Sequence, residues 1–188
     1  MSVVRVGAWR VDVVVRPGVR PPLSGAALAR AVARAGAAAG APLPASATIV
    51  LTDDEELADL NAVHMGHEGP TDVLSFPMLP PEAFPPHASD HDRRPAAPAP
   101  PMPHRPGRAG GRTHIGDIAV SVERAAEQAG EGRGGQTGDV RWSVADELRL
   151  LVTHGTLHLC GWDHADPAEE AEMRALERRL LAGAAPGR

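Results

Sequence analysis

The sequence feature that most limits the fold is an interruption that runs from Pro77 to Arg112. Proline, alanine, histidine and arginine dominate this stretch, and large apolar side chains are almost absent from it. Such a composition does not bury enough apolar surface to offset the entropy that is lost on ordering. We therefore predict a disordered or mobile insertion at residues 77–112, with the core built from the segments on either side.

The chain is long enough for one hydrophobic core. It has 188 residues, of which 43% are hydrophobic and 23% charged, and this length suits one domain better than two. The formal net charge is -5 at pH 7, so bulk positive charge does not hold a nucleic acid to this protein. We predict a single domain over residues 1–188, in which any contact with nucleic acid is local.

The cysteine content and the N-terminus bear on the compartment. Cys160 is the single cysteine, which excludes a fold stapled by internal disulfides. Near the N-terminus, apolar residues alternate with Arg5, Arg10 and Asp12, unlike the apolar region of a signal peptide. No apolar run approaches the roughly 20 residues of a membrane span. We expect a cytoplasmic protein with no membrane contact.

Hydrophobic periodicity and capping residues predict strands and helices on both sides of the insertion at residues 77–112. The predicted strands are Val3–Arg16, Thr48–Leu51, Val73–Phe76 and Ile115–Val122. The predicted helices run from Gly25 to about Ala39, from a capping box at Thr52–Glu55, over 123–129, from Ser143 to about Cys160, and from Asp166 to before Gly183. We expect the two strands that flank the insertion to pair as a hairpin.

Three histidines in the segment from His154 to His164 have the spacing H-x3-H-x5-H. At about 100° per residue, His154 and His158 lie one turn apart on one helical face, so both imidazoles can reach one ion. Gly161 can end the helix in the left-handed conformation that glycine adopts at little cost, and the connector after it can return His164 as a third ligand. Three imidazoles leave a fourth tetrahedral position open for water, as catalytic zinc sites do.

Other interpretations of these residues remain open. A histidine pair one turn apart also occurs on solvated helix faces, although the glycine and the third histidine favour a metal site. The zinc-protease signature H-E-x-x-H has a glutamate where this chain has Gly155, so peptidase chemistry of that kind lacks its base. Cys160 points away from the histidines in the helical register, and we interpret it as a small buried hydrophobic residue.

The segment from His154 to His164 resembles the H-G-x-L-H-L-x-G-[YW]-D-H signature of the bacterial YbeY family, which are metal-dependent endoribonucleases of ribosomal RNA maturation. Further segments agree in order: Leu60-Asn61, Pro70 to Pro77, Gly116 to Ser121, Glu147-Leu148, and Met173 with Glu177. The resemblance implies an α+β fold, with a small mixed four-stranded sheet packed with about five helices in a YbeY-like, zincin-like metal-hydrolase architecture. It also implies one zinc ion per chain, held by His154, His158 and His164.

The resemblance implies a zinc-dependent endoribonuclease specific for single strands, acting in late maturation of the 16S rRNA 3′ end and in quality control of the 70S ribosome. The implied partners are ribosomal RNA, proteins of the small ribosomal subunit and the GTPase Era. Two other interpretations stay open: a ribosome-assembly factor whose zinc only staples the fold, and a zinc hydrolase of another ester or amide. Spacing alone does not distinguish zinc from other divalent metals.

Five further residues are candidates for the site. Asp72, Ser75 and Asp117 lie on strand segments of the motif, and we predict that they line a substrate groove beside the metal; turn capping is the alternative for the two aspartates. Glu147 is the nearest candidate in the sequence to orient a water. The alternative is that Glu147 is a solvated glutamate on the helix surface. Asp163 is placed either to accept a hydrogen bond from an imidazole or to cap its loop.

Two departures from the family pattern affect RNA binding. Alignment on Pro70-Thr71-Asp72 puts Met65 where members usually carry an arginine thought to contact RNA phosphate; we interpret the nearby His64 and His67 as solvated surface residues. The insertion is longer than is usual. Its arginines are either phosphate contacts or part of a solvated loop: Arg93, Arg94, Arg105, Arg108 and Arg112. Its histidines are predicted to be spectators: His87, His91 and His104.

Overall fold

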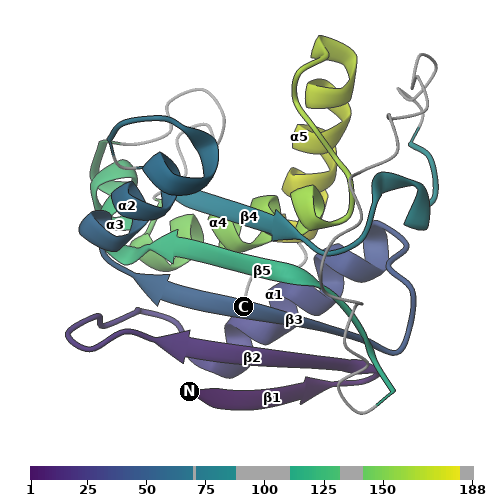
Figure 1. Ribbon diagram of the computed structural model, residues 1–188, viewed down its shortest axis with the longest axis horizontal. Coiled ribbons are helices and arrows are strands. Elements are labelled where there is room, and N and C mark those ends of the chain that lie inside the picture. The colour runs from purple at the N-terminus through teal and green to yellow at the C-terminus, as the bar shows by residue number, and fades with distance from the viewer. Residues whose placement is uncertain (70, 88–110, 132–141, 183–188) are drawn as a thin grey trace.

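The computed structural model of the protein describes residues 1–69, 71–87, 111–131 and 142–182. Within these residues, five strands form one mixed sheet in the order β1-β2-β3-β5-β4, with helices on both of its faces (Figure 1). The strands are β1 (Ser2–Val6), β2 (Trp9–Val15), β3 (Ala45–Thr52), β4 (Val73–Pro77) and β5 (Thr113–Ser121). The helices are α1 (Gly25–Ala38), α2 (Asp54–Met65), α3 (Val122–Glu131), α4 (Val144–Leu159) and α5 (Pro167–Ala182), with a short 3-10 helix at Pro81–Ala83.

The α+β class is confirmed, but the sheet of the described residues has five strands where we predicted four. The additional strand comes from Val3–Arg16, which we predicted as a single strand. The chain turns at Gly7 and Ala8, and Val6 pairs with Trp9 in an antiparallel hairpin. Gly7 has a φ of 56°, a left-handed conformation that glycine adopts without the steric cost of a Cβ. This glycine inside a valine-rich run is the sequence signal for the turn.

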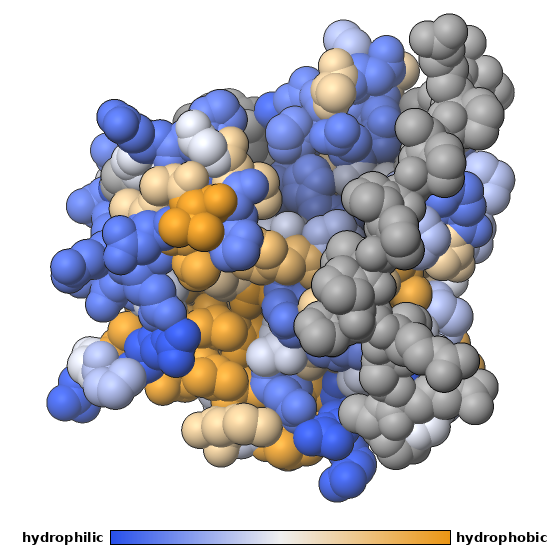
Figure 2. All heavy atoms as spheres, viewed as in Figure 1, coloured by the Kyte–Doolittle hydropathy of each residue, from blue (hydrophilic) through white to orange (hydrophobic). Residues whose placement is uncertain are grey.

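The sheet topology places β4 and β5 beside α4. β2, β3 and β5 are parallel, while β1 and β4 run antiparallel to their neighbours. The predicted pairing across the insertion is confirmed, because β4 pairs with β5 and Ser75 lies opposite Ile118. α1 and α4 pack on one face of the sheet, and α2 lies on the other face (Figure 1). Figure 2 shows this second face, where hydrophilic and hydrophobic residues are mixed.

Apolar side chains fill the space between the sheet and the α1–α4 layer. Ile49, Ile118 and Leu148 are fully buried there. A smaller cluster under α2 consists of Leu57, Leu74 and Ala119. Successive residues of a strand point to opposite faces, so the neighbours Ile118 and Ala119 belong to different clusters. The same alternation decides which side chains of β4 and β5 can reach α4.

Capping side chains fix where the helices begin. Ser24 and Ser143 are the N-caps of α1 and α4, as predicted. The N-cap of α2 is Asp53, one residue later than the predicted capping box, and its carboxylate accepts the backbone N–H of Glu56. Thr52 does not cap because it is the last residue of β3.

The structure corrects the predicted insertion at its beginning. Pro77 is part of β4, a 3-10 turn follows, and Phe84 is only 6% exposed in the main core. Residues 77–87 therefore belong to the fold, because Phe84 gives this proline-rich stretch an apolar anchor. Residues 88–110 lie outside the described residues, and disorder there stays a prediction.

The helices bury one side and expose the other. α5, for example, buries Met173 and Leu176 and exposes Arg174 and Arg178. No helix in the described part of the chain is long and apolar enough to cross a membrane.

Candidate metal centre

Two of the three predicted ligands come from the C-terminal half of α4. His154 and His158 are four residues apart, so one helical turn brings their rings to the same side. Their Nε2 atoms are 3.0 Å apart, and the ring planes meet at 82° with centroids 4.5 Å apart. Both side chains are partly buried, so the pair borders solvent while α4 remains packed in the core.

Gly155, between the two histidines, lets α4 lie directly on the sheet. A Cβ at this position would be 2.9 Å from Cγ2 of Ile118 and 3.1 Å from Oγ of Ser75. The Ser75 hydroxyl donates a hydrogen bond of 3.1 Å to the Gly155 carbonyl. The close packing has no room for a larger residue at the position where zinc proteases carry their catalytic glutamate, and it fixes the histidines beside β4.

The connector between α4 and α5 supplies the third histidine. Gly161 has a φ of 85°, the predicted left-handed conformation after a helix end. The ring of His164 lies 5.0 Å from that of His158 and 5.8 Å from that of His154, and the ligand atoms of all three lie within 4.8 Å of one another. The backbone N–H of His164 donates to Oδ1 of Asp163 at 2.7 Å, so Asp163 caps this turn.

Hydrogen bonds determine the tautomers of the first two histidines. Nδ1 of His154 is 2.7 Å from Oε1 of Glu177, and Nδ1 of His158 is 2.8 Å from the carbonyl oxygen of Trp162. A carboxylate and a carbonyl only accept, so Nδ1 is the donor in both rings, and Nε2 carries a lone pair whenever its ring is neutral. These lone pairs face each other at 3.0 Å. A cation or an extra proton between them relieves the repulsion.

The donor set fits a zinc ion. Zinc binds imidazole nitrogens at about 2.0–2.1 Å, so two nitrogens of a tetrahedral site are about 3.4 Å apart. The Nε2 pair is already at 3.0 Å, and the whole set spans at most 4.8 Å. His164 is exposed on its connector, so a small movement of its ring closes the set. A carboxylate or carbonyl on the far nitrogen is the usual support of a metal-bound histidine.

The pKa of His158 favours the form that binds metal. It is lowered from 6.5 to about 4, chiefly because burial disfavours the imidazolium and next because of the neighbouring His154 ring. His158 is therefore neutral at pH 7. A neutral imidazole is the form that coordinates metals, because its unprotonated nitrogen offers a lone pair.

Glu177 is a site residue to which the sequence analysis assigned no role. It lies on α5, is only 9% exposed, and holds His154. The signal that could have identified it is its place at the edge of the apolar stripe of Met173 and Leu176, because an ionisable residue on the buried side of a helix needs a partner.

A groove of about 600 Å³ opens beside the histidines. Its walls are the end of α2, β4 and the connector after α4, and they include Met65, Asp72, Ser75, Trp162 and the three histidines. Asp72 and Ser75 thus line the groove as predicted. No arginine among the described residues lines it.

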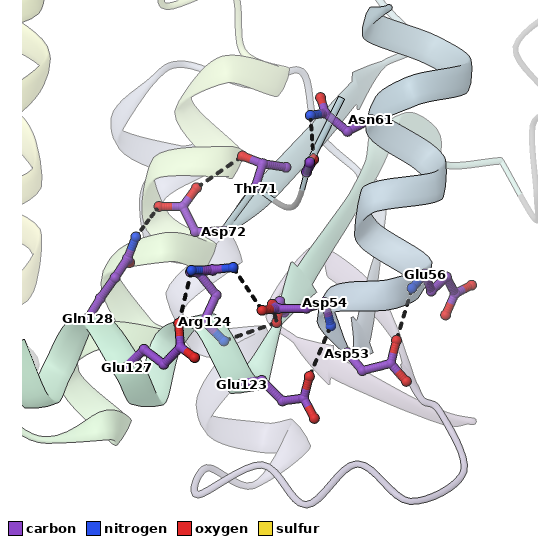
Figure 3. Close-up of polar contacts among 12 residues, drawn as sticks. Asp53, Asp54, Glu56, Asn61, Thr71, Asp72, Glu123, Arg124, Glu127 and Gln128 are labelled. Carbon is purple, nitrogen blue, oxygen red and sulfur yellow. Dashed lines mark hydrogen bonds and ion pairs between the residues drawn. The ribbon is translucent and has the colours of Figure 1, made fainter. Parts of the chain in front are cut away.

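Asp72 is oriented by residues outside the histidine cluster. Its Oδ2 accepts a hydrogen bond of 3.0 Å from Gln128 on α3, and its Oδ1 is 3.5 Å from the Thr71 hydroxyl (Figure 3). Oδ1 also accepts the backbone N–H of Val73 at 2.8 Å. Asp72 therefore both caps the start of β4 and borders the groove. The prediction that it lines the groove and the alternative that it caps a turn are both correct.

Asp117 does not line the groove, contrary to our prediction. Ser75 and Ile118 lie opposite each other on the face that packs against α4, so Asp117, the preceding residue of β5, points to the other face. There its Oδ1 is 2.9 Å from Nε2 of His114. Burial alone raises the pKa of Asp117, but hydrogen bonds from His114 and Thr48 outweigh it and the pKa is lowered.

Glu147 is buried and lines neither of the two cavities that contain histidines of the cluster. Its Oε2 accepts a hydrogen bond from the indole N–H of Trp142, so it holds the segment that precedes α4. It lies seven residues before His154, about 10 Å along the helix axis. None of its described contacts supports the predicted role of orienting a water.

His87, predicted to be a spectator in the insertion, packs on the signature segment. Its ring stacks on Trp162 with centroids 4.2 Å apart, and its Nε2 is 3.2 Å from Oε1 of Glu169. The same carboxylate oxygen accepts the backbone N–H of Asp163 at 2.7 Å. The start of the insertion thus supports the connector that carries His164.

The residues near the position of the family arginine, and the arginines of the insertion, differ in where they lie relative to the groove. Met65, at that position, ends α2 and is 43% exposed at the groove. His64 contacts Phe76 edge-on and does not line the groove, as expected for a surface histidine. Arg112 donates a hydrogen bond to the backbone carbonyl of Ala8. The other arginines of the insertion lie outside the described residues, as do its two remaining predicted spectators: Arg93, Arg94, Arg105, Arg108, His91 and His104.

Cys160 is buried, as predicted. It is 2% exposed, and burial raises the pKa of its thiol to about 12. A thiol with such a pKa is protonated at pH 7 and is a poor metal ligand.

One family model and several known proteins are similar to this chain. The family model described as Endoribonuclease YbeY matches residues 25–185. The Endoribonuclease YbeY of Thermobifida fusca is 38% identical over 173 residues, which cover 92% of each chain. The protein of the same name from Corynebacterium glutamicum is 42% identical over 138 residues, 73% of this chain and 58% of that relative. The solution structure of TM1509 from Thermotoga maritima is 19% identical, with a TM-score of 0.49 and 93% and 88% of the two chains covered.

The assignment rests on the first two matches. The family model covers most of the chain, and the Thermobifida fusca relative is matched over nearly its whole length. The chain therefore belongs to the YbeY endoribonuclease family.

Proposed function

We propose that this protein is a zinc-dependent endoribonuclease of single-stranded RNA, with one zinc ion per chain. We propose that it acts in the cytoplasm, in the late maturation of the 16S rRNA 3′ end and in the quality control of 70S ribosomes. The observation that carries the proposal is the pair of Nε2 atoms of His154 and His158, 3.0 Å apart with His164 beside them. Membership of the family supports the choice of reaction.

The chain's own residues prepare the ligands. Glu177 and the Trp162 carbonyl keep His154 and His158 in the tautomer that offers Nε2, and burial keeps His158 neutral. Zinc held by three such ligands supplies Lewis-acid chemistry: it polarises a phosphoryl oxygen and lowers the pKa of a water toward about 7. This chemistry suits hydrolysis of a phosphodiester.

The groove is the proposed path of the RNA strand. It borders the three histidines on one side and β4 on the other. Trp162 and Met65 offer apolar surface in its walls, on which unpaired bases can pack, and a single strand exposes such bases where a duplex does not. Specificity for single strands follows from that difference.

Ribosomal RNA, proteins of the small ribosomal subunit and the GTPase Era are the proposed partners. The net charge of the chain is -5, and the groove contains Asp72 and Asp163 but no arginine among the described residues. Phosphate contacts contribute much of the affinity for RNA, so this groove alone binds RNA weakly. A ribosomal partner that holds the RNA near the histidines compensates for that weakness.

The test combines metal analysis with an assay of RNA cleavage. Wild-type protein, His158→Gln and the exposed-surface control His67→Gln are purified, and their zinc content and cleavage of a single-stranded ribosomal RNA fragment are measured with and without a chelator. We expect one zinc per wild-type chain and cleavage that the chelator abolishes. His158→Gln loses metal affinity and activity by about 100-fold or more, and His67→Gln keeps both.

Three outcomes contradict the proposal. If fully zinc-loaded wild-type protein leaves RNA intact and chelation changes nothing, the protein is not this nuclease. If His158→Gln loses its helical circular dichroism signal, zinc is a structural staple. Turnover of a small ester that depends on His158, without RNA cleavage, identifies another hydrolase.

A further inference from the structure

The segment that follows β4 brings His87 onto the connector between α4 and α5. Phe84 anchors this segment in the main core. The ring of Pro85 packs on Gly40 after α1, where a Cβ on the glycine would lie 2.5 Å from Cγ of the proline. Two residues later, the side chain of His87 is only 6% exposed. The segment is therefore fixed on the fold up to His87.

The connector is exposed where it carries the third histidine. Asp163 and His164 are both exposed, and the hydrogen bond from the His164 N–H to Oδ1 of Asp163 is local. Such a bond fixes the shape of a turn but not its direction relative to the neighbouring helices. Contacts with those helices supply the direction. The Trp162 N–H donates to the Leu157 carbonyl of α4 at 3.1 Å, and the Asp163 N–H donates to Oε1 of Glu169 on α5 at 2.7 Å.

His87 contacts both Trp162 and Glu169. Its ring stacks on the indole of Trp162, with centroids 4.2 Å apart and planes that meet at 23°. Its Nε2 lies 3.2 Å from Oε1 of Glu169, and because a carboxylate only accepts, this nitrogen is the donor. The same oxygen accepts the Asp163 N–H. One imidazole therefore holds the indole that precedes the turn and the carboxylate that orients the turn.

We propose that His87 is a positioning residue for the metal centre, which holds the connector so that His164 faces His154 and His158 before an ion binds. The identity of the ion as a catalytic zinc rests on the proposed function, whereas the support of the connector is a property of the metal-free chain. His87 is not itself a ligand, because the ligand atoms that lie within 4.8 Å of one another belong to the other three histidines.

The physical reason for the effect is preorganisation. A ligand on a free turn loses conformational entropy when it joins an ion, and this loss lowers the affinity for the ion. A turn that the fold already holds loses less. Removal of His87 is therefore expected to weaken metal binding while all three ligands remain.

The test compares the full chain of His87→Ala with wild-type protein and with His64→Ala. His64 is a matched control, because its ring also contacts an aromatic side chain, that of Phe76, but does not line the groove. Co²⁺ is the probe ion, because its absorption bands report the number and geometry of its ligands. A titration followed by absorbance measures cobalt affinity. Hydrogen exchange of metal-free protein, read by mass spectrometry on peptides that contain Asp163 and His164, measures the connector.

We expect His87→Ala to bind cobalt about tenfold more weakly, the lower end of the usual effect of removing a support of a metal ligand. Its absorption spectrum at saturation stays that of wild type, because the three ligands are unchanged. In metal-free protein, the connector amides exchange roughly fivefold faster, as the loss of about one hydrogen bond predicts. His64→Ala behaves as wild type in every measurement.

A second variant serves if His87→Ala fails to fold, which a thermal melt detects. His87→Phe keeps a ring that can stack on Trp162 and loses the donor to Glu169. Its cobalt affinity is expected to fall by about fivefold, the effect of one lost hydrogen bond, and the same criteria then apply to it.

The outcomes separate this inference from the proposed function. If wild-type protein binds cobalt and its zinc form cleaves RNA, but the His87 variant binds cobalt equally well, the positioning role is wrong and the nuclease proposal stands. A different spectrum at saturation also overturns the role, because His87 then acts as a ligand. If wild-type protein binds no cobalt, the proposed function fails, and exchange in the metal-free proteins alone decides whether His87 holds the connector.

Discussion

Glu177 decides which nitrogen of His154 is offered to a metal. Its carboxylate is almost fully buried and lies 2.7 Å from Nδ1 of that ring. A buried carboxylate is costly unless it is paired, and the imidazole N–H provides the partner. The pair thus stabilises the position of α5 against α4 and sets the tautomer of a ligand.

Replacement of Glu177 by glutamine tests this coupling. The amide oxygen still accepts the Nδ1 proton, but the hydrogen bond no longer involves a charged acceptor and is weaker. We expect zinc affinity to fall by about 10–100-fold, the usual effect of removing such a support, with the fold retained. Competition with a chromophoric chelator measures the affinity. Glu55→Gln, at an exposed position of α2, is the matched control, and equal affinities of the two variants would contradict the role.

At the scale of elements, the position of α4 depends on Gly155. The helix crosses β4 and β5 so closely that a methyl group there meets Ile118, Ser75 and Val73 at 2.9–3.2 Å. Because His154 and His158 flank this glycine, the contact that packs α4 also fixes the two ligands. The contact between Gly155 and the sheet is therefore expected to affect both the stability of the fold and the position of the two histidines.

Gly155→Ala is expected to destabilise the protein by about 1–3 kcal/mol, the usual cost of overpacking a core, and to weaken zinc binding as α4 shifts. Gly130→Ala on α3 is the matched control, because a Cβ there meets nothing within 4 Å. The control is expected to be neutral or to stabilise by up to about 1 kcal/mol, since alanine favours a helix over glycine. Urea unfolding of both variants measures the effect, and a stable Gly155→Ala protein would show that α4 has room to move.

The elements also show what could be predicted from the sequence. Helix caps and the histidine spacing depend on residues close in sequence, so α4, its end at Gly161 and the three-histidine cluster were predictable. The direction of Asp117 was not, because β5 has a bulge: Ser46 and Ala47 pair with His114 and Gly116, which leaves Ile115 as an extra residue. One extra residue reverses which side chains of the strand point to which face of the sheet. The extra residue is recognised only from the pairing with β3.

The partners of the site residues come from distant parts of the chain. Glu177 reaches His154 across 23 residues, and His87 stacks on Trp162 from a segment whose composition indicated disorder. Such contacts depend on tertiary packing, which neither periodicity nor local propensity describes. Sequence reasoning therefore identified the three histidines that cluster, but not the residues that contact them.

For the whole molecule, the lowered pKa of His158 makes the stability of the metal-free protein depend on pH. Folding lowers this pKa from 6.5 to about 4, so between these values the unfolded chain binds more protons than the folded one. The contribution of His158 is fully present above pH 6.5 and is lost as the pH falls toward 4. We expect the urea midpoint of metal-free protein to fall over that window and the fall to be smaller in His158→Gln. Parallel pH profiles for the two proteins would contradict the assignment.

The connector that carries His164 determines how the protein would respond to the loss of an ion bound by the three histidines. Two ligands sit on a helix that the core holds in place, and the third sits on an exposed turn between α4 and α5. An ion bound by all three histidines would join the connector to α4. Without the ion, the exposed turn loses one of the interactions that hold it, while α4 stays packed in the core. We therefore expect proteases to cleave metal-free protein near Asp163 faster than metal-bound protein, before either form unfolds.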